Sequence, residues 1–265
     1  MNYGEFKEAV WEASRSLYRD MPWRRQTDPY YVLVSELMLQ QTQVDRVIPK
    51  FEAFLQTFPT IETLAQASLS EVLTQWNGLG YNRRAKFLHE AAKKVMTDFN
   101  GVIPHTLTEL VSLPGIGPNT AGAILNYSFN QPTVFIETNV RTVFFYHFFK
   151  DSQLVSDAEL KVLVEATIDQ EHPREWYWAL MDYGAFLKRQ GAGAIDKSKH
   201  YKKQAPLKGS LREVRGKIIH ALSQRDWNVS ELRQEMPQDD RFEIALTALK
   251  AEGMVQQSRS LLHLP

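Results

Sequence analysis

The strongest constraint on the fold of this chain is a long series of segments with helical periodicity. Apolar residues recur at the spacing of one helix face, while clear strand alternation is missing from the first 200 residues. Pro59, Pro104, Pro132 and Pro173 fall between these segments, where a proline disturbs a helix least. We expect helices over residues 6–19, 31–47, 50–58, 61–67, 69–76, 83–99, 107–113, 120–128, 139–149 and 157–168. The predicted fold class is therefore all-α.

Composition excludes several classes of site. The 265-residue chain contains no cysteine, which excludes disulfides, a thiolate zinc site, an iron–sulfur cluster and a cysteine nucleophile. No stretch approaches the ~18 apolar residues of a membrane span, and residues 1–18 lack the apolar core of a signal peptide. We expect a soluble cytoplasmic protein without a cofactor, associated with the nucleoid if the source is bacterial.

Charge is balanced over the whole chain but not along it. Lys plus Arg and Asp plus Glu both number 31, yet residues 186–217 hold ten basic residues and only two acidic ones, Asp196 and Glu213. Such a segment is either a solvated basic linker or a stretch that lines a phosphate backbone.

Residues 211–265 have the pattern of a small second domain. We expect three helices, the last ended by Gly253, and then a hairpin of strands within residues 254–264. The three helices are predicted over residues 211–223, 228–236 and 241–252. This order is the winged-helix pattern, which contacts either DNA or protein. The expected organisation is a helical domain over 1–187, a basic segment and linker over 188–210, and a winged-helix-like domain over 211–265.

A glycine-containing turn carries the first functional motif. Leu113-Pro114-Gly115-Ile116-Gly117 joins two predicted helices, the second beginning near Thr120, so the pair forms a hairpin over residues 107–128. Gly115 and Gly117 allow a sharp turn whose backbone amides point outward at a helix N-terminus and can bind a phosphate. The turn is either a plain connection or such a site, with a monovalent or divalent cation left open. Its sequence resembles the helix-hairpin-helix element of DNA repair enzymes.

Glu36 is the first candidate catalytic residue. Its neighbours at helical spacing include Val32, Leu33 and Leu39, so its carboxyl lies on a mostly apolar stripe. A carboxyl there should have a raised pKa, which suits a general acid. The alternative is a glutamate at the helix edge that reaches solvent or an arginine. The polar run of residues 40–43 that follows could wedge into a base stack or pair with an orphaned base.

Glu137 is the second candidate. An apolar extended run delivers its carboxylate to the start of a predicted helix, where Thr138 or Asn139 can cap. Either this carboxylate only interacts with the helix dipole, or it forms a pair with Glu36 whose pKa values are pushed apart. Glycosidic-bond cleavage uses such a pair, in which one acid protonates the leaving group and one anion stabilises the oxocarbenium ion.

Further motifs accompany these residues in a characteristic order. They are Pro22-Trp23-Arg24, Asp28-Pro29-Tyr30, Ser35 to Val44, Gly78-Leu79-Gly80-Tyr81, Leu113 to Leu125 and Asn139-Val140. Together they resemble the mismatch-specific adenine DNA glycosylases of the helix-hairpin-helix DNA glycosylase superfamily. The resemblance covers residues 6–187 and implies two helical subdomains, with the target base flipped into the cleft between them.

The resemblance implies a role for each candidate residue. Glu36 matches the glutamate that protonates the adenine leaving group, and Glu137 stands at the position of the aspartate that stabilises the sugar cation. Asn119 stands where lyase-competent relatives have a Schiff-base lysine, which implies a monofunctional glycosylase. Gln41 and Tyr81 match residues that fill or pry the base stack. The positions matching the base pocket are Arg19, Trp23, Arg24, Leu39 and Trp178.

The sequence departs from the family at several positions. Glu137 is one methylene longer than aspartate, Asn119 replaces the serine or tyrosine of adenine-specific members, and Trp178 replaces a Glu or Gln that reads the edge of adenine. The four-cysteine iron–sulfur cluster of most relatives is missing, and residues 211–265 are too short for the domain that reads 8-oxoguanine. We expect the phosphate contacts of the cluster loop to come instead from Lys188, Arg189, Lys197, Lys199, Lys202 and Lys203.

The expected function is base excision repair by a monofunctional DNA N-glycosylase that flips and excises a mispaired base and leaves an abasic site. Adenine opposite 8-oxoguanine or guanine is the leading substrate. The alternatives are a thymine or uracil mismatch glycosylase and a non-catalytic DNA-binding module. The expected partner is double-stranded DNA with a mismatched or damaged base, and residues 211–265 could also bind a protein. We expect no interaction with a membrane, and we expect the protein to be a monomer.

Overall fold

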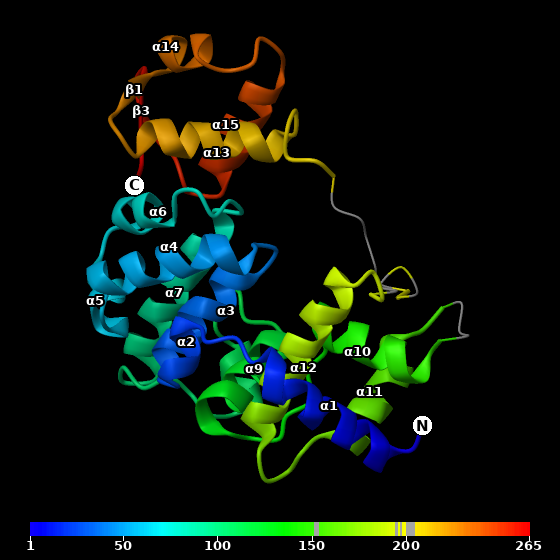
Figure 1. Ribbon diagram of the computed structural model, residues 1–265. Helices are drawn as coiled ribbons and strands as arrows, with labels where there is room; N and C mark the ends of the chain where they lie inside the picture. Colours follow the sequence, from blue (N-terminus) through cyan, green and yellow to red (C-terminus); the bar gives the residue numbers. More distant parts are fainter. Residues whose placement is uncertain (151–153, 194–195, 197, 200–204) are drawn as a thin grey trace. The chain divides into compact units, whose positions relative to one another are not determined.

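The computed structural model describes residues 1–150, 154–193, 196, 198–199 and 205–265 (Figure 1). The described part is mostly α-helical, which confirms the predicted fold class. Its helices before residue 190 are α1 (Tyr3–Leu17), α2 (Pro22–Arg25), α3 (Pro29–Leu39), α4 (Val44–Thr57), α5 (Ile61–Gln66), α6 (Leu69–Trp76), α7 (Arg83–Asp98), α8 (Leu107–Val111), α9 (Pro118–Phe129), α10 (Thr138–Phe148), α11 (Asp157–Thr167) and α12 (Pro173–Arg189). No described helix is long and apolar enough to cross a bilayer.

The chain divides into two compact units. The first holds Met1–Val32, His105–Val111 and Ile116–Lys203, and the second holds Leu33–Pro104, Ser112–Gly115 and Gln204–Pro265. Helix α3 begins in the first unit and continues into the second, so Glu36 belongs to the second unit and Glu137 to the first.

Aromatic side chains form the core of the first unit. The ring of Phe6 on α1 lies 4.9 Å from the rings of Phe144 and Phe148 on α10, measured between centroids. Trp176 of α12 closes the same cluster, 6.1 Å from Phe6. Helix α12 therefore packs along both α1 and α10 (Figure 1), and this contact fixes the residues that α12 brings to the site.

In the second unit, α7 is the helix on which α5 and α6 pack. Capping boxes at Thr60 and Ser68 begin α5 and α6. At the end of α6, the fully buried Trp76 donates its indole hydrogen to the carbonyl of Gly80 at 3.2 Å. The loop between α6 and α7 therefore starts from a fixed point.

Residues 211–265 are part of the second unit and are called the C-terminal domain below; they have the winged-helix order of elements. These are α13 (Leu211–Leu222), β1 (Trp227–Asn228), α14 (Val229–Gln234), α15 (Arg241–Ala251), β2 (Gln256–Ser258) and β3 (Leu261–His263). The strands are antiparallel in the order β1-β3-β2, with Leu262 paired to Trp227 on one side and to Gln257 on the other. The three helices and the hairpin agree with the sequence pattern, whereas β1 is too short to show any periodicity.

Several helices differ from the sequence-based expectation, including the short α2, which was not predicted. The helix predicted over residues 31–47 is divided, because Gln41 takes a positive φ of 57° between α3 and α4. Helix α4 then continues through Pro49, which lies inside it. Helix α12, with 17 residues, was not predicted at all. Its apolar stripe is interrupted by Asp182, whose carboxylate finds its partners only in the folded protein.

Candidate functional site

Glu36 lies in the middle of α3 among buried residues. Val32, Leu33, Leu37 and Met38 are at most 2% exposed, whereas Glu36 is half-buried. The apolar surroundings predicted for it are therefore present along the helix. Glu36 therefore stands at the border between the apolar core and the surface.

The polar run after α3 leaves the helix. Gln41 is exposed, and its left-handed backbone conformation is uncommon for a residue other than glycine. Thr42 donates its hydroxyl hydrogen to the carbonyl of Leu79 at 3.3 Å, which joins this turn to the loop before α7. The prediction that residues 40–43 continue the helix is wrong, because the backbone turns at Gln41 and exposes its amide.

Arg84 of α7 holds both of these segments. Its Nη1 donates to the carbonyls of Leu37 at 2.6 Å and Met38 at 2.9 Å. Its Nη2 donates to the carbonyl of Gly80 at 3.0 Å and to Thr42 Oγ1 at 3.1 Å. Burial lowers the pKa of Arg84 to about 10, so the guanidinium stays charged at neutral pH. Sequence analysis missed this residue, because nothing local distinguishes it from a surface arginine at the start of a helix.

Tyr81 ends the wedge loop, which we define as residues 78–81. Gly78, Gly80 and Tyr81 all have positive φ, of 93°, 73° and 50°. The Tyr81 ring lies near two guanidinium groups, with its centroid 5.5 Å from Cζ of Arg84 and 5.0 Å from Cζ of Arg212 on α13. Arg212 also donates a hydrogen bond to the Tyr81 hydroxyl. The ring is thus held by contacts from two parts of the second unit.

The glycine turn before α9 has one glycine that the fold requires and one that it does not. Gly115 has φ 76°, and a Cβ there would lie 2.7 Å from Cβ of Phe87. Gly117 has φ −89°, and a Cβ there would meet no described atom within 4 Å. Gly117 is the exposed N-cap residue of α9, and Thr120 is half-buried in its first turn. Gly117 therefore leaves the backbone open to a ligand, as a phosphate site needs.

An extended segment leads to Glu137, and Tyr177 of α12 fixes its backbone. The Tyr177 hydroxyl accepts the amide hydrogen of Phe135 at 3.1 Å and donates to the carbonyl of the same residue at 3.2 Å. The two rings stack with centroids 3.9 Å apart. Sequence analysis did not single out Tyr177, which is fully buried. It replaces the neighbouring strand that this segment lacks.

Asn119 of α9 holds the next residue along the same segment. Its Oδ1 accepts the amide hydrogen of Ile136 at 3.4 Å, and its Nδ2 donates to the Ile136 carbonyl at 3.5 Å. Both hydrogen bonds are long. The side chain at the position of the family's lysine therefore contacts the backbone directly before Glu137.

Glu137 is the N-cap residue of α10 and is half-buried. Burial raises its pKa to about 7, while the positive charge of Lys188 opposes the rise. Its side chain makes no capping hydrogen bond, and Thr138 and Asn139 lie inside the helix. The expectation that one of these two caps the helix is wrong. Desolvation is the larger of the two effects on this carboxyl.

Helix α12 approaches the start of α10 at a glycine. A Cβ on Gly184 would lie 2.3 Å from the carbonyl oxygen of Asn139, closer than real contacts allow. The Asn139 Oδ1 is buried and has no hydrogen-bond partner within the part of the chain that the structure describes. Gly184 therefore sets the position of the first turn of α10, and with it that of Glu137.

Arg19 and Arg24, both predicted to line a base pocket, share one buried carboxylate. Asp182 accepts hydrogen bonds from Arg19 Nε at 2.6 Å and from Arg24 Nη1 and Nη2 at 2.7 and 3.1 Å. The Asp182 and Arg24 side chains are 1% and 4% exposed, whereas that of Arg19 is 30% exposed. Arg24 is thus part of the core of the first unit, and Arg19 reaches its surface.

The other predicted pocket residues fall in both units. Trp178 is half-buried, and the Cζ of Arg24 lies 5.4 Å from the centroid of its ring. Trp23 is buried in α2. Trp178, Arg24 and Trp23 all belong to the first unit. Leu39 is half-buried at the end of α3 in the second unit.

The basic segment is described only in part. Lys188 and Arg189 lie at the end of α12, where both residues are exposed overall. The ammonium group of Lys188 is nevertheless partly desolvated, which lowers its pKa. Lys199 donates its backbone amide hydrogen to the carbonyl of Val155 at 3.1 Å, and its charge helps to lower the pKa of Glu159 after the hydrogen bonds from Ser156. Three of the predicted phosphate contacts lie outside the described residues, namely Lys197, Lys202 and Lys203.

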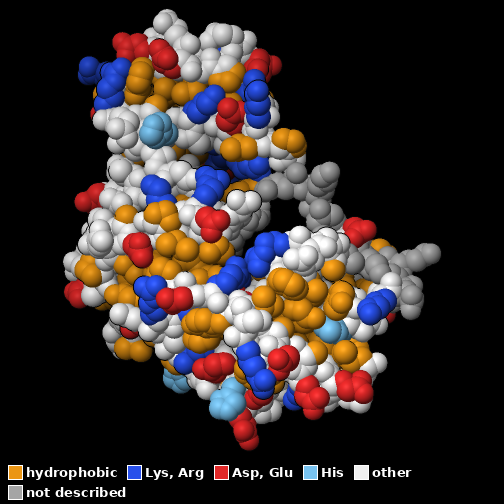
Figure 2. All heavy atoms as spheres, in the orientation of Figure 1, with side chains coloured by type: hydrophobic (Ala, Val, Ile, Leu, Met, Phe, Trp, Pro, Cys, Tyr) orange, Lys and Arg blue, Asp and Glu red, His pale blue; other side chains and the backbone are white. Residues whose placement is uncertain are grey.

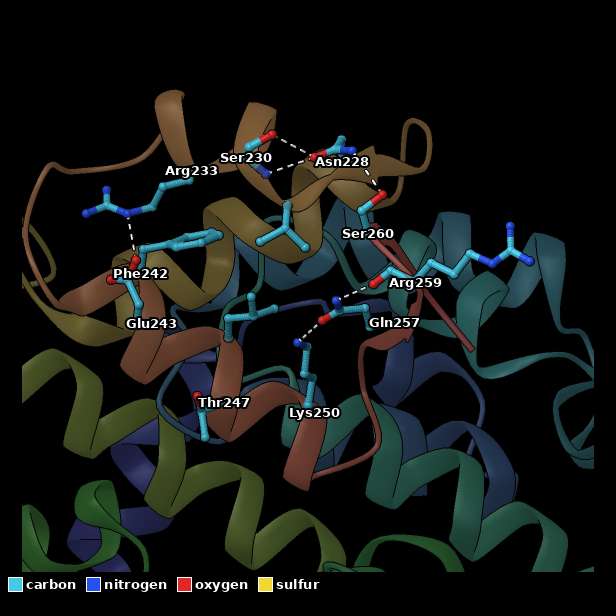
Figure 3. A pocket seen from close by; sticks show the side chains of 12 residues that line it. Asn228, Ser230, Arg233, Phe242, Glu243, Thr247, Lys250, Gln257, Arg259 and Ser260 are labelled. Carbon is cyan, nitrogen blue, oxygen red and sulfur yellow. Dashed lines mark hydrogen bonds and ion pairs between the residues drawn. The ribbon is translucent and has the colours of Figure 1, made fainter.

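A cavity of about 740 Å³ opens on the C-terminal domain between α14, α15 and the hairpin (Figure 3). Phe242 and Leu246 are among the residues that line it, and Arg233 pairs with Glu243 at 2.7 Å (Figure 3). It contains no residue singled out by the sequence analysis. Within the described ranges, no cluster of three or more His, Asp or Glu is placed to hold a metal ion. An iron–sulfur cluster does not fit this chain, which has no cysteine to bind it.

Comparison with known protein families and sequences gives consistent matches. The family model described as "HhH-GPD superfamily base excision DNA repair protein" matches residues 34–166. An adenine DNA glycosylase of Mycolicibacterium smegmatis is 32% identical over 91% of this chain and 89% of that protein. One from Buchnera aphidicola subsp. Baizongia pistaciae is 36% identical over 64% of this chain and 48% of that protein. The chain therefore spans about half the length of this relative.

Solved structures share the fold. A thermostable thymine-DNA glycosylase superposes with a TM-score of 0.63 and 24% identity over 69% of this chain and 86% of that one. Endonuclease III trapped on DNA superposes with a TM-score of 0.57 and 18% identity over 78% and 91%. At these identities the likeness establishes the architecture.

Proposed function

The chain belongs to the HhH-GPD superfamily of base excision DNA repair proteins, and we propose that it is a monofunctional glycosylase that removes adenine from mispairs in double-stranded DNA. The observation that carries the proposal is the likeness to the mycobacterial adenine DNA glycosylase, which runs along nearly the whole of both chains. The two carboxylates and the glycine turn support it.

In the proposed reaction Glu36 is the acid and Glu137 the anion. Glu36 gives a proton to a ring nitrogen of the flipped adenine, and the bond from C1′ to N9 breaks with its electron pair leaving on the base. The Glu137 carboxylate stabilises the oxocarbenium ion that remains. Water then adds to C1′ and loses a proton, which leaves free adenine and an abasic site.

The charge state of Glu137 is the sensitive point of this reaction. The carboxyl has to be ionised, yet burial raises its pKa to about 7 in the protein without DNA. Lys188 favours the anion, and Glu137 in turn favours the charged form of Lys188, whose own pKa is lowered by burial and by Arg19. We propose that Lys188 acts on Glu137 as well as on the DNA backbone.

Asn119 supports release of the base without strand cleavage. An amide nitrogen is not basic and forms no Schiff base, so Asn119 cannot replace the lysine of a lyase. Its hydrogen bonds to Ile136 give it a different task, which is to hold the segment before Glu137. In this proposal Asn119 has a structural role and forms no bond to the sugar.

Binding to the duplex is assigned to four groups of residues. The backbone at Gly115, Gly117 and Thr120 takes a phosphate, and Gln41 and Tyr81 enter the base stack. Recognition of the flipped base is assigned to Trp178, Trp23, Leu39 and Arg19, whereas Arg24 holds Asp182, the carboxylate that also pairs with Arg19. The remaining phosphate contacts are assigned to Lys188, Arg189, Lys197, Lys199, Lys202 and Lys203. Replacing several of these six by alanine should lower the affinity for DNA and reduce its dependence on salt.

A panel of duplexes tests the substrate. Single-turnover reactions, with alkaline strand cleavage as the readout, would compare adenine opposite 8-oxoguanine, adenine opposite guanine, thymine opposite guanine and uracil opposite guanine. We expect cleavage of the two adenine duplexes and intact strands when the alkali is omitted. Cleavage of the thymine or uracil duplexes alone would show that the protein is instead a thymine or uracil mismatch glycosylase. Binding to every duplex without cleavage would indicate a DNA-binding module.

A further inference from the structure

Within the second unit, the C-terminal domain contacts the chain on both sides of the wedge loop. Before the loop, Asn77 Nδ2 donates to His220 Nδ1 at 2.8 Å and to Ser223 Oγ at 2.9 Å, both near the end of α13. After the loop, Lys86 of α7 donates to the carbonyl of Glu252, directly after α15. Figure 2 shows Lys, Arg, Asp and Glu side chains interspersed on the face of the molecule in view. The domain thus contacts both ends of the ten-residue stretch 77–86, which contains Tyr81.

Glu252 makes the main contacts after the loop. Its carboxylate pairs with Arg83 of α7 at 2.6 Å and with Arg215 of α13 at 2.6 Å. Burial would raise the pKa of Glu252, but the hydrogen bonds from Arg215 and Arg83 hold it below its usual value. One carboxylate therefore joins the start of α7 to the domain, two residues beyond Tyr81.

Between these two sets of contacts, Arg212 of α13 contacts Tyr81 itself. Its guanidinium donates to the Tyr81 hydroxyl, and its Nη2 donates to the carbonyl of Ala205 at 3.2 Å. The wedge loop has three residues with positive φ, so its backbone gains little support from regular structure. A tyrosine on such a loop loses much side-chain freedom when it enters a base stack. Holding its hydroxyl end in advance removes part of that cost.

We propose that the C-terminal domain braces the wedge loop, and that Arg212 is a positioning residue that holds Tyr81 ready to enter the base stack of DNA. The inference deepens the proposed function and rests on it for the role of Tyr81. It gives the C-terminal domain a part in opening the duplex. This part explains why a domain with eight basic and eight acidic residues, and no net charge, belongs to a DNA repair protein.

The test measures base unstacking without base release. All proteins carry Glu36→Gln, and the duplex carries 2-aminopurine beside the target adenine, so that stopped-flow fluorescence follows unstacking. We expect Arg212→Ala and Tyr81→Phe each to slow the unstacking step about fivefold, the worth of one hydrogen bond. The double variant should be no slower than either single one. Arg225→Ala, which removes an equal charge from an exposed position of the same domain, should have no effect.

The possible results separate the two proposals. Unchanged unstacking in Arg212→Ala would overturn the brace, as would effects of Arg212→Ala and Tyr81→Phe that multiply in the double variant. A lower melting temperature with normal unstacking would mean a merely structural contact and would overturn it too. The brace would also be overturned if the Glu36→Gln protein, without further changes, did not unstack the duplex at all. If the protein with Glu36 intact releases no adenine while unstacking still depends on Arg212, the proposed function fails and the brace stands.

Discussion

The hydroxyl group of Tyr177 exchanges two hydrogen bonds with the backbone of Phe135, two residues before Glu137. A fully buried side chain thus does the work of a neighbouring β-strand for the segment that presents the carboxylate. The contact links the core of the first unit to the proposed chemistry, so damage to one should be visible in the other.

Removal of that hydroxyl by Tyr177→Phe should affect both stability and rate. The amide and carbonyl of Phe135 would be left buried without partners, at a cost of about 2–4 kcal/mol in the free energy of unfolding. A shift of Glu137 by about 1 Å would slow base release by up to about 100-fold. Urea denaturation and single-turnover assays measure the two effects. Tyr3→Phe, which removes the same atom from an exposed side chain, is the control, and equal effects in both variants would count against the account.

The raised pKa of Glu137 predicts that stability depends on pH in a specific window. The folded protein holds this proton up to a pKa of about 7, above the ordinary value of 4.5, so it binds more protons than the unfolded chain between these limits. Stability should therefore fall by about 3 kcal/mol as the pH rises from about 4.5 to 7. His147, whose pKa is lowered to about 4 by burial and by Lys150, acts in the opposite direction over part of this range.

The variant Glu137→Gln isolates the contribution of this carboxyl. The difference in unfolding free energy between Glu137→Gln and the parent should grow in favour of the variant from pH 5 to pH 8, because only the parent has to bury a charge. Parallel denaturation curves at the two pH values give this difference directly. An unchanged difference would show that the carboxyl has an ordinary pKa.

A side chain at Gly184 should displace α10. The Cβ of Gly184→Ala would lie 2.3 Å from the Asn139 carbonyl oxygen, and a backbone atom cannot yield as a flexible side chain does. We expect a loss of about 1–3 kcal/mol in stability together with slower base release. Gly216→Ala is the matched control, since a Cβ in this part of α13 meets no described atom within 4 Å. It should be neutral or stabilising by up to about 1 kcal/mol, and the account fails if the two alanines behave alike.

Loss of the charge on Asp182 should unfold much of the first unit. Asp182→Asn leaves Arg24 buried and Arg19 partly buried without their anion, at a cost of about 3–5 kcal/mol. The exposed pair of Asp20 and Arg25 offers the comparison, because Asp20→Asn should cost less than about 1 kcal/mol. Chemical denaturation of both variants checks this order, which a similar loss in the two would contradict.

The sequence predicts those parts of the fold that are set by local patterns. Helical periodicity gives most helices within a few residues, and the glycine turn is recognisable because Gly115 needs both a positive φ and the space beside Phe87. Glu36 stands out because a carboxylate on an apolar stripe is unusual. These features depend on residues that are close together in the sequence.

The features that escape the sequence depend on distant partners. Arg84, Tyr177 and Asp182 look like ordinary helix residues until the fold places carbonyls or guanidinium groups beside them. The pKa of Glu137 is unpredictable for the same reason, since it is raised by burial among distant residues. Gln41 breaks its helix without any glycine or proline to announce the turn.

The central claim is that Glu36 supplies the proton for release of adenine. The decisive measurement is free adenine, detected by mass spectrometry, from a duplex with adenine opposite 8-oxoguanine under single-turnover conditions. The account predicts release by the parent protein and none by Glu36→Gln, which should bind the same duplex with similar affinity. Adenine released equally by both proteins would contradict the role of Glu36, and no adenine from the parent protein would contradict the function itself.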